Sequence, residues 1–198
     1  MAERAVLLKA RNLASRRGGR IVVAGIDLTV DRGGLYVLRG ANGSGKTSLL
    51  RTLAGFSPPA SGSLERTDGQ ATFLGHVDGL KAALTARENI SFWRALYRSP
   101  SDAAGRAVER LGVSPFIDQR ASSLSAGQKR RLALCRVALS GRALWLLDEP
   151  TAGMDAANIA AVINLIQDHC GEGGAAIVAT HEPLGFETAV TITLNEAP

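Results

Sequence analysis

Cysteine and aromatic residues are scarce in this chain. Its 198 residues include only Cys135 and Cys170, which lie far apart and have no CxxC spacing. This argues against a disulfide framework or a zinc site, and we expect both thiols to be reduced. Aromatic residues make up 5% of the chain, and none interleave with basic residues in a way that would stack nucleobases. We therefore expect no nucleic-acid partner.

Long apolar runs are also missing. No stretch approaches 18 unbroken apolar residues, so no segment is expected to span a membrane. Residues 1–12 start with charged side chains but contain no apolar core of the kind a signal peptide needs. We therefore expect a cytoplasmic location. The hydrophobic share of 45% is ordinary for a globular protein, and the length suits a single domain over residues 1–198.

The positive charge is concentrated in the first third of the chain. Residues 1–60 carry ten Lys or Arg and three Asp or Glu, whereas the remainder carries 13 basic and 15 acidic residues. Such a basic region is typical of proteins that meet nucleic acid, acidic lipid headgroups or a polyphosphate ligand. A solvated basic surface explains it equally well, so charge alone leaves these alternatives open.

The order of apolar patterns favours an α/β protein with a mostly parallel sheet. Strands that alternate with helices flank a helical stretch, about residues 78–140, which we interpret as a lobe inserted in the core. The expected strands are 5–8, 21–30, 35–39, 71–74, 143–147, 175–180 and 190–194, and the expected helices are 47–55, 86–97, 101–111, 126–139 and 156–169.

A glycine-rich loop between an expected strand and an expected helix matches G-x-x-x-x-G-K-[ST]. It comprises Gly40, Ala41, Asn42, Gly43, Ser44, Gly45, Lys46 and Thr47, with Ser48 following in the helix. Glycines let backbone N–H groups wrap closely around phosphates, and the helix N-terminus adds a favourable dipole. We expect Lys46 to reach the β- and γ-phosphates and Thr47 to offer its hydroxyl to Mg²⁺. The loop predicts binding of a nucleotide such as ATP.

Two acidic residues follow another apolar strand. Asp148 and Glu149 come directly after residues 143–147, which places their carboxylates at the carboxyl edge of the sheet, where open α/β sheets bind ligands. Asp148 is suited to hold Mg²⁺, and Glu149 can direct a water at the γ-phosphate. Together with the phosphate loop, the pair predicts hydrolysis of the nucleotide.

A third motif identifies a family by resemblance. The segment Leu124-Ser125-Ala126-Gly127-Gln128 resembles the signature loop of ABC ATPases, usually LSGGQ, with Ala126 replacing the first glycine. Residues 151–155, which end at Asp155, look like the D-loop of that family. His181, which follows the expected strand 175–180, looks like its switch histidine. The resemblance covers nearly the whole chain and implies the ABC ATPase fold with an antiparallel N-terminal β-subdomain.

The same resemblance implies a head-to-tail homodimer with composite sites. In this family each ATP is held by the phosphate loop of one subunit and the signature loop of the other, so Ser125, Gly127 and Gln128 are expected to bind the partner's nucleotide. Asp155 of the D-loop is also expected to contribute to nucleotide binding. ATP closes such a pair and hydrolysis opens it. The family also implies integral membrane subunits as partners and a peripheral position on the cytoplasmic face of the bacterial inner membrane.

Two positions depart from the usual pattern of the family. The segment 15–18 has no aromatic residue to stack on adenine, and we expect the guanidinium plane of Arg17 to replace it. His76 stands where most members have a glutamine that contacts Mg²⁺ or water. Histidine can hydrogen-bond there as well, and a surface loop residue is the alternative interpretation.

The segment Gly75–Asn89 narrows the resemblance to one branch. Its pattern, G-H-x-x-G-x-K-x-x-L-T-x-x-E-N, is similar to that of the ATP-binding subunit of the haem exporter in bacterial cytochrome c maturation. The chain has no Cys-x-x-Cys-His motif, so we expect no direct haem binding. The alternative within transporters is the ATPase subunit of an exporter for another small solute or peptide.

Other classes fit less well. Chromosome-maintenance ATPases insert long coiled coils between phosphate loop and signature, but only 79 positions separate Lys46 from Ser125 here, without sustained heptads. Translation factors of the superfamily carry two ATPase domains. A plain P-loop kinase or GTPase would lack the signature loop and the switch histidine.

Overall fold

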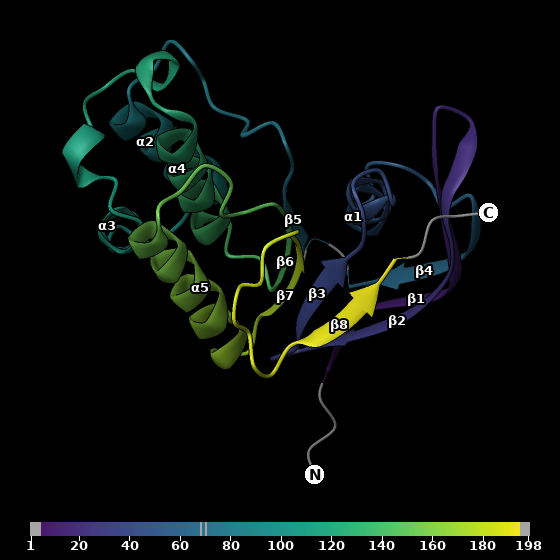
Figure 1. Cartoon of the computed structure of the whole chain (residues 1–198). Coiled ribbons are helices and arrows are strands. Elements are labelled where there is room, and N and C mark those ends of the chain that lie inside the picture. The colour runs from purple at the N-terminus through teal and green to yellow at the C-terminus, as the bar shows by residue number, and fades with distance from the viewer. Residues whose placement is uncertain (1–4, 68, 70, 195–198) are drawn as a thin grey trace. The chain divides into compact units, whose positions relative to one another are not determined.

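The computed structural model describes residues 5–67, 69 and 71–194, and its elements fall into two units (Figure 1). The first unit comprises residues up to Gly75, 142–149 and 167 onwards, and the second comprises 76–141 and 150–166. Within the described residues, no helix is both long and apolar enough to cross a bilayer.

The first unit contains the strands and one complete helix. Its strands are β1 (Val6–Arg17), β2 (Arg20–Asp31), β3 (Leu35–Arg39), β4 (Ser61–Arg66), β5 (Ala71–Leu74), β6 (Leu144–Asp148), β7 (Ala175–Ala179) and β8 (Val190–Thr193), and its helix is α1 (Lys46–Ala54). β2, β1 and β4 form an antiparallel sheet in that order, and a parallel sheet has the order β5-β6-β7-β3-β8. The expected α/β fold, with a parallel sheet and antiparallel N-terminal strands, is confirmed.

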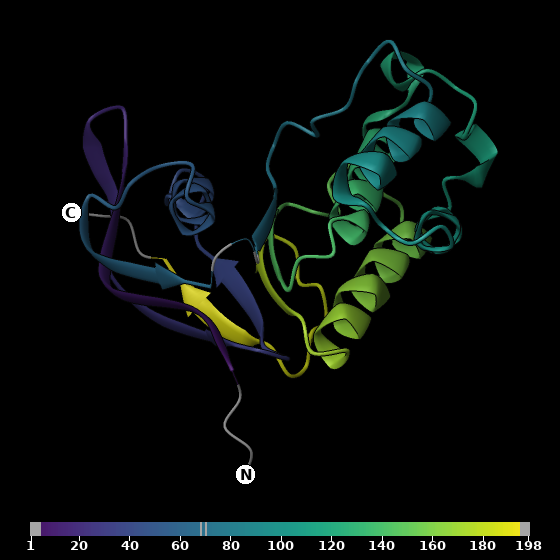
Figure 2. The same ribbon diagram turned by 180° about the vertical axis from the view of Figure 1, so that it is seen from behind.

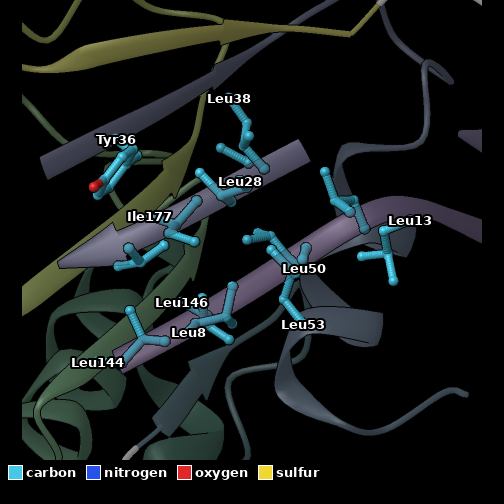
Figure 3. Close-up of a cluster of buried hydrophobic side chains, with 14 of the residues drawn as sticks. Leu8, Leu13, Leu28, Tyr36, Leu38, Leu50, Leu53, Leu144, Leu146 and Ile177 are labelled. Atoms are coloured by element: carbon cyan, nitrogen blue, oxygen red, sulfur yellow. The ribbon is translucent and has the colours of Figure 1, made fainter. Parts of the chain in front are cut away.

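The central strands are buried on both faces because their sequences are continuously apolar. β6 and β7 are buried along their whole length, as parallel strands covered on both sides require. Side chains from both sheets and from α1 meet in one core, including Leu8 of β1, Leu50 of α1 and Ile177 of β7 (Figure 3). Helix α1 packs against strands of both sheets, which fixes the loop that precedes it.

β4 was missed by the sequence pattern, and β1 is longer than expected. The residues of β4, SGSLER, are exposed except for the half-buried Leu64, so no alternation of apolar residues announces this edge strand. The expected strands 5–8 and 21–30 left residues 9–20 outside any strand, but pairing continues to Arg17 and Arg20, and only Gly18 and Gly19 turn. Backbone pairing with β2 therefore overrides the polar character of this segment.

The second unit is helical. It contains α2 (Ala86–Tyr97), α3 (Ala103–Arg110), α4 (Ala126–Leu139) and the first part of α5 (Ala156–Gly171), together with short 3₁₀ turns at Ser114–Phe116 and Ala121–Ser123. α2 and α3 pack against α4 (Figure 2). Thr85 and Ser125 begin α2 and α4 with capping boxes, in which each N-cap side chain and the third helical residue satisfy each other's backbone N–H groups.

Candidate functional site

The phosphate loop joins β3 to α1 in the first unit. Gly43 and Gly45 have φ angles of 88° and 93°, in the left-handed region that favours glycine. A Cβ atom at Gly45 would also overlap with the side chain of Val23 on β2. The loop thus needs glycine both for its backbone conformation and for its close approach to the antiparallel sheet.

Lys46 and Ser44 present polar atoms within this loop. The ammonium of Lys46, a buried residue, donates to the carbonyl oxygens of Gly40 at 2.8 Å and Ala41 at 3.1 Å. The buried Oγ of Ser44 has no hydrogen-bond partner among the residues that the structure describes. A buried cation held by carbonyls, next to an unsatisfied hydroxyl, fits a site that an anion completes. The loop is therefore suited to a polyphosphate, while Ala41 and Asn42 lie exposed on its rim and Ser48 is half-buried in α1.

Thr47 and Asp148 meet although 101 positions separate them. The hydroxyl of Thr47, at the start of α1, donates to Oδ2 of Asp148, at the end of β6, over 2.7 Å. A hydroxyl and a buried carboxylate in contact form a donor set that suits Mg²⁺, which keeps several waters and phosphate oxygens and needs few protein ligands. Which of the two groups would bind the ion directly stays a prediction.

Glu149, the residue after Asp148, has an unusual backbone conformation. Its φ of 48° lies in the left-handed region, and its N–H donates to the carbonyl of Ala179 at the end of β7 over 2.8 Å. Such a conformation costs a non-glycine residue free energy and persists only where the surrounding structure imposes it. Its Oε1 lies 3.3 Å from Nε2 of His181. The left-handed residue at the end of β6 thus places its carboxylate beside the imidazole.

Arg17 lies at the end of the β1–β2 hairpin and is exposed. Two residues before it, Ser15 is buried and its hydroxyl donates to Oγ1 of Thr52 on α1 over 3.0 Å. Val23, which faces Gly45 of the phosphate loop, pairs with Ser15 across the sheet. The hairpin end is therefore attached to the helix that begins at the phosphate loop, and an adenine contact by Arg17 stays a prediction.

The signature segment belongs to the second unit. The N–H of Ser125 donates to Oε1 of Gln128 over 2.8 Å, and the N–H of Gln128 donates back to Oγ of Ser125 over 3.2 Å. A Cβ atom at Gly127 would overlap with the carbonyl oxygen of Gly153, so the backbones of the two loops touch. This contact gives Gly127 a packing reason to be glycine, separate from any approach to phosphate.

Asp155 stands just before α5 in the same unit. Its Oδ1 accepts hydrogen bonds from the backbone N–H and the side-chain amide of Asn158, both over 2.9 Å. The backbone hydrogen bond from Asn158, followed by the one from its side chain, lowers the pKa of the Asp155 carboxyl. The residue therefore remains ionised at neutral pH and acts as a helix cap on its own chain.

The segment Gly75–Asn89 owes much of its pattern to its own folding. Thr85 and Glu88 form the capping box of α2. The buried side chain of Asn89 accepts from the N–H of Lys81 over 2.9 Å and donates to the carbonyl oxygens of Lys81, at 3.1 Å, and Thr85, at 2.9 Å. His76 itself is exposed, and contact with Mg²⁺ stays a prediction.

The structure thus brings the sequence-predicted residues together in two groups. Lys46, Thr47, Asp148, Glu149 and His181 gather at the carboxyl edge of the parallel sheet in the first unit. The second unit holds the signature segment, Asp155 and His76. Sequence reasoning missed Asp78 and Arg130 of the second unit, whose side chains form an ion pair over 2.8 Å. No sequence signal links these two residues, because 52 positions separate them.

Comparison with known proteins agrees with this geometry. Residues 23–152 match the ABC transporter family. The chain is 46% identical to the cytochrome c biogenesis ATP-binding export protein CcmA of Cereibacter sphaeroides, over 94% of this chain and 88% of that protein. It is 45% identical to the protein of the same name from Paracoccus denitrificans, over 96% of this chain and 89% of that one.

Solved structures share the fold. A structure described as the ATP-binding subunit of an ABC transporter superimposes with a TM-score of 0.84 and 20% identity, over 96% of this chain and 86% of the other. An ABC transporter ATP-binding protein from Pyrococcus furiosus gives a TM-score of 0.81 at 22% identity, over 94% and 96%. These likenesses establish the ABC ATPase fold, and with the family match they show that this chain is an ATPase that belongs to the ABC transporter family.

Proposed function

We propose that this chain is the ATP-hydrolysing subunit of a membrane export complex that serves cytochrome c biogenesis. Its main support is the 46% identity, along nearly the whole length of both chains, to a protein named for that process. The segment Gly75–Asn89, which resembles the haem-exporter branch, supports the same assignment. Export of haem itself would be a task of the membrane partners, because this chain has no haem-attachment motif.

In the proposed site, five residues of the first unit act on the nucleotide. Lys46 neutralises the β- and γ-phosphates while the glycine loop donates backbone N–H groups to them. Thr47 and Asp148 hold Mg²⁺, a role that their 2.7 Å hydrogen bond supports. When bound, the ion supplies charge stabilisation to the phosphate oxygens. His76 is a further candidate ligand, directly or through water.

Glu149 and His181 carry the chemical step in this proposal. The Glu149 carboxylate orients a water for in-line attack on the γ-phosphorus and takes up its proton, while the bond to the bridging oxygen breaks and leaves ADP and phosphate. The 3.3 Å contact from His181 supports a role in holding that carboxylate. Because the contact with His181 limits the orientations of the Glu149 side chain, its carboxylate needs little reorganisation during reaction.

The complete site requires a second copy of the chain in this proposal. Ser125, Gly127 and Gln128 contact the nucleotide bound by the partner, Asp155 also contributes to nucleotide binding, and Arg17 stacks on adenine. The position of this segment at the N-terminus of α4 supports the first part, because the helix dipole favours anions there. ATP then joins the two subunits, and hydrolysis separates them by charge repulsion.

We further propose a single ABC ATPase domain with a helical lobe at about 78–140, bound to integral membrane subunits on the cytoplasmic face of the bacterial inner membrane.

Deletion of the gene in the source bacterium tests the assignment. We expect loss of c-type cytochromes, measured by haem staining and by reduced-minus-oxidised spectra. Restoration by the wild-type gene and not by Lys46→Ala would tie the phenotype to nucleotide binding. Normal c-type cytochromes in the deletion strain would contradict the assignment and favour an exporter for another solute or peptide.

A further inference from the structure

Two charged side chains of the helical unit, one buried and one half-buried, form an ion pair. Nη1 of Arg130 lies 2.8 Å from Oδ1 of Asp78, and the two side chains are 6% and 22% exposed. The same unit has an ion pair of equal length, Arg87 with Asp118, whose side chains are 60% and 75% exposed. An exposed ion pair contributes little to the stability of the fold. Loss of one partner of a buried pair costs more, because the other charge is shielded from water. Asp78 and Arg130 therefore constrain the segments that carry them.

Those segments carry two of the proposed site's motifs. Asp78 lies two residues after His76, in the loop that leads from β5 towards α2, and Arg130 lies two residues after Gln128 in α4. The capping box between Ser125 and Gln128 keeps the first turn of α4 helical up to its N-terminus. A displacement of Arg130 along the helix is therefore passed to the signature end, because a hydrogen-bonded helix moves as a stiff rod.

The contact continues from α4 to the D-loop. The backbone of Gly127 packs directly on the carbonyl of Gly153, leaving no room for a side chain. Two residues later, Asp155 caps α5 through Asn158. The His76 loop, the signature segment and the D-loop are thus connected by an unbroken series of contacts within one unit, and the buried ion pair is the charged link in that series.

We propose that Asp78 and Arg130 are positioning residues of the ATPase site. The ion pair keeps the loop after His76 and the signature end of α4 in fixed relation, and so sets how tightly the composite site holds ATP without either side chain touching the nucleotide. This inference rests on the proposed composite site. It adds a pair of residues through which a ligand bound at His76 affects the position of Ser125.

Steady-state ATPase measurements on the full-length chain test the proposal. We expect Asp78→Asn to raise KM for ATP by about fivefold or more, the usual range of coupling between sites, while kcat changes much less. The matched control is Asp118→Asn, which breaks the exposed pair in the same unit and is expected to leave both constants as in the wild type.

A double variant tests whether the ion pair positions the ATPase site or only stabilises the fold. Asp78→Asn combined with Arg130→Met removes both charges of the pair, so a change in this variant is not caused by one charge left without the other. If the pair positions the site, the double variant also shows the raised KM. A return to the wild-type KM, or a fall in kcat at unchanged KM, would overturn the proposal. Normal c-type cytochromes in the deletion strain would instead refute the proposed export function and leave the positioning role of the pair as measured.

Discussion

The hydroxyl of Thr47 donates a 2.7 Å hydrogen bond to the carboxylate of Asp148, which joins the start of α1 to the end of β6. β3 and β6 run parallel on either side of β7, so the loops that follow them lie at the same edge of the sheet. This arrangement allows the bond to form. It brings the oxygen donors of two separate motifs together before any ion is bound.

Thr47→Val should raise the Mg²⁺ concentration that half-saturates ATPase activity. Valine keeps the shape of threonine but lacks the hydroxyl. Loss of an oxygen donor at a metal site lowers the affinity for the metal by about tenfold or more. Titration of Mg²⁺ at saturating ATP measures this. Thr47→Ser, which retains the hydroxyl, is the control, and an unchanged Mg²⁺ requirement in Thr47→Val would contradict the assignment.

Glu149→Gln should bind ATP but fail to turn it over. The amide keeps the size of the side chain and loses the capacity to accept a proton, so we expect the single-turnover rate to fall by about 10²-fold or more. Equilibrium binding of a fluorescent ATP analogue should change little. Glu187→Gln, at an exposed acid, is the matched control. Single-turnover hydrolysis of Glu149→Gln at the wild-type rate would rule out this role.

Glu149→Gly should make the nucleotide-free protein more stable than Glu149→Ala. Both variants lose the carboxylate, but only glycine adopts the φ of 48° without a steric penalty. The difference in unfolding free energy should be about 1 kcal/mol, the usual cost of the left-handed conformation for residues with a Cβ. Urea denaturation measures it, and equal midpoints would show that the backbone strain is absent in solution.

Thr52→Val should destabilise the protein more than Ser15→Ala. In Ser15→Ala, the Thr52 hydroxyl keeps its 3.1 Å bond to the carbonyl of Ser48. In Thr52→Val, the buried Ser15 hydroxyl loses its acceptor, which costs about 1–3 kcal/mol. Chemical denaturation of the two variants should give this order, and the reverse order would mean that Ser15 finds another acceptor.

The stability of the protein should fall in mild acid because of His169. Its ring stacks on Trp145 at 3.8 Å between centroids, and Nε2 lies 3.1 Å from the carbonyl of Ala143. Burial lowers the pKa of His169 below its ordinary 6.5, although the carbonyl hydrogen bonds and Glu172 oppose the shift. Between the ordinary pKa and the lowered pKa, His169 is protonated in the unfolded chain but not in the folded chain. The unfolding free energy therefore declines as the pH falls through this range.

His169→Phe should remove that part of the pH dependence. Phenylalanine can still stack on Trp145, and the carbonyl of Ala143 keeps its 2.7 Å bond from the N–H of Ala175. Thermal or urea unfolding between about pH 7 and pH 5.5 compares the two proteins in a range where most carboxylates stay ionised. Parallel pH profiles for wild type and variant would show that His169 does not carry the effect.

Strongly patterned elements could be predicted, and weakly patterned ones could not. The limits of β3, β5, α2 and α4 were predicted to the residue, because caps, turns or prolines bound their apolar segments. β4 had no apolar alternation to find, since it is an exposed edge strand that pairs with β1. Its place depends on backbone hydrogen bonds, which side-chain patterns do not record.

The chemistry expected of this protein follows from short local motifs. Eight consecutive positions from Gly40 to Thr47 specify a phosphate loop, because the backbone conformations and the cation that it needs are local properties of glycine and lysine. The acid pair, signature segment and His181 then identified the ABC family, which the family match and the 46% identical relative confirmed.

Which of these residues meet depends on how the chain folds. The contacts of Thr47 with Asp148 and of Glu149 with His181 depend on strand order in the parallel sheet, and strand order is not written in local periodicity. The buried pairing of Asp78 with Arg130 depends likewise on how α4 packs against the loop before α2. Long-range pairs arise from the packing of whole elements. Local sequence patterns therefore identify the residues that take part but not which of them pair.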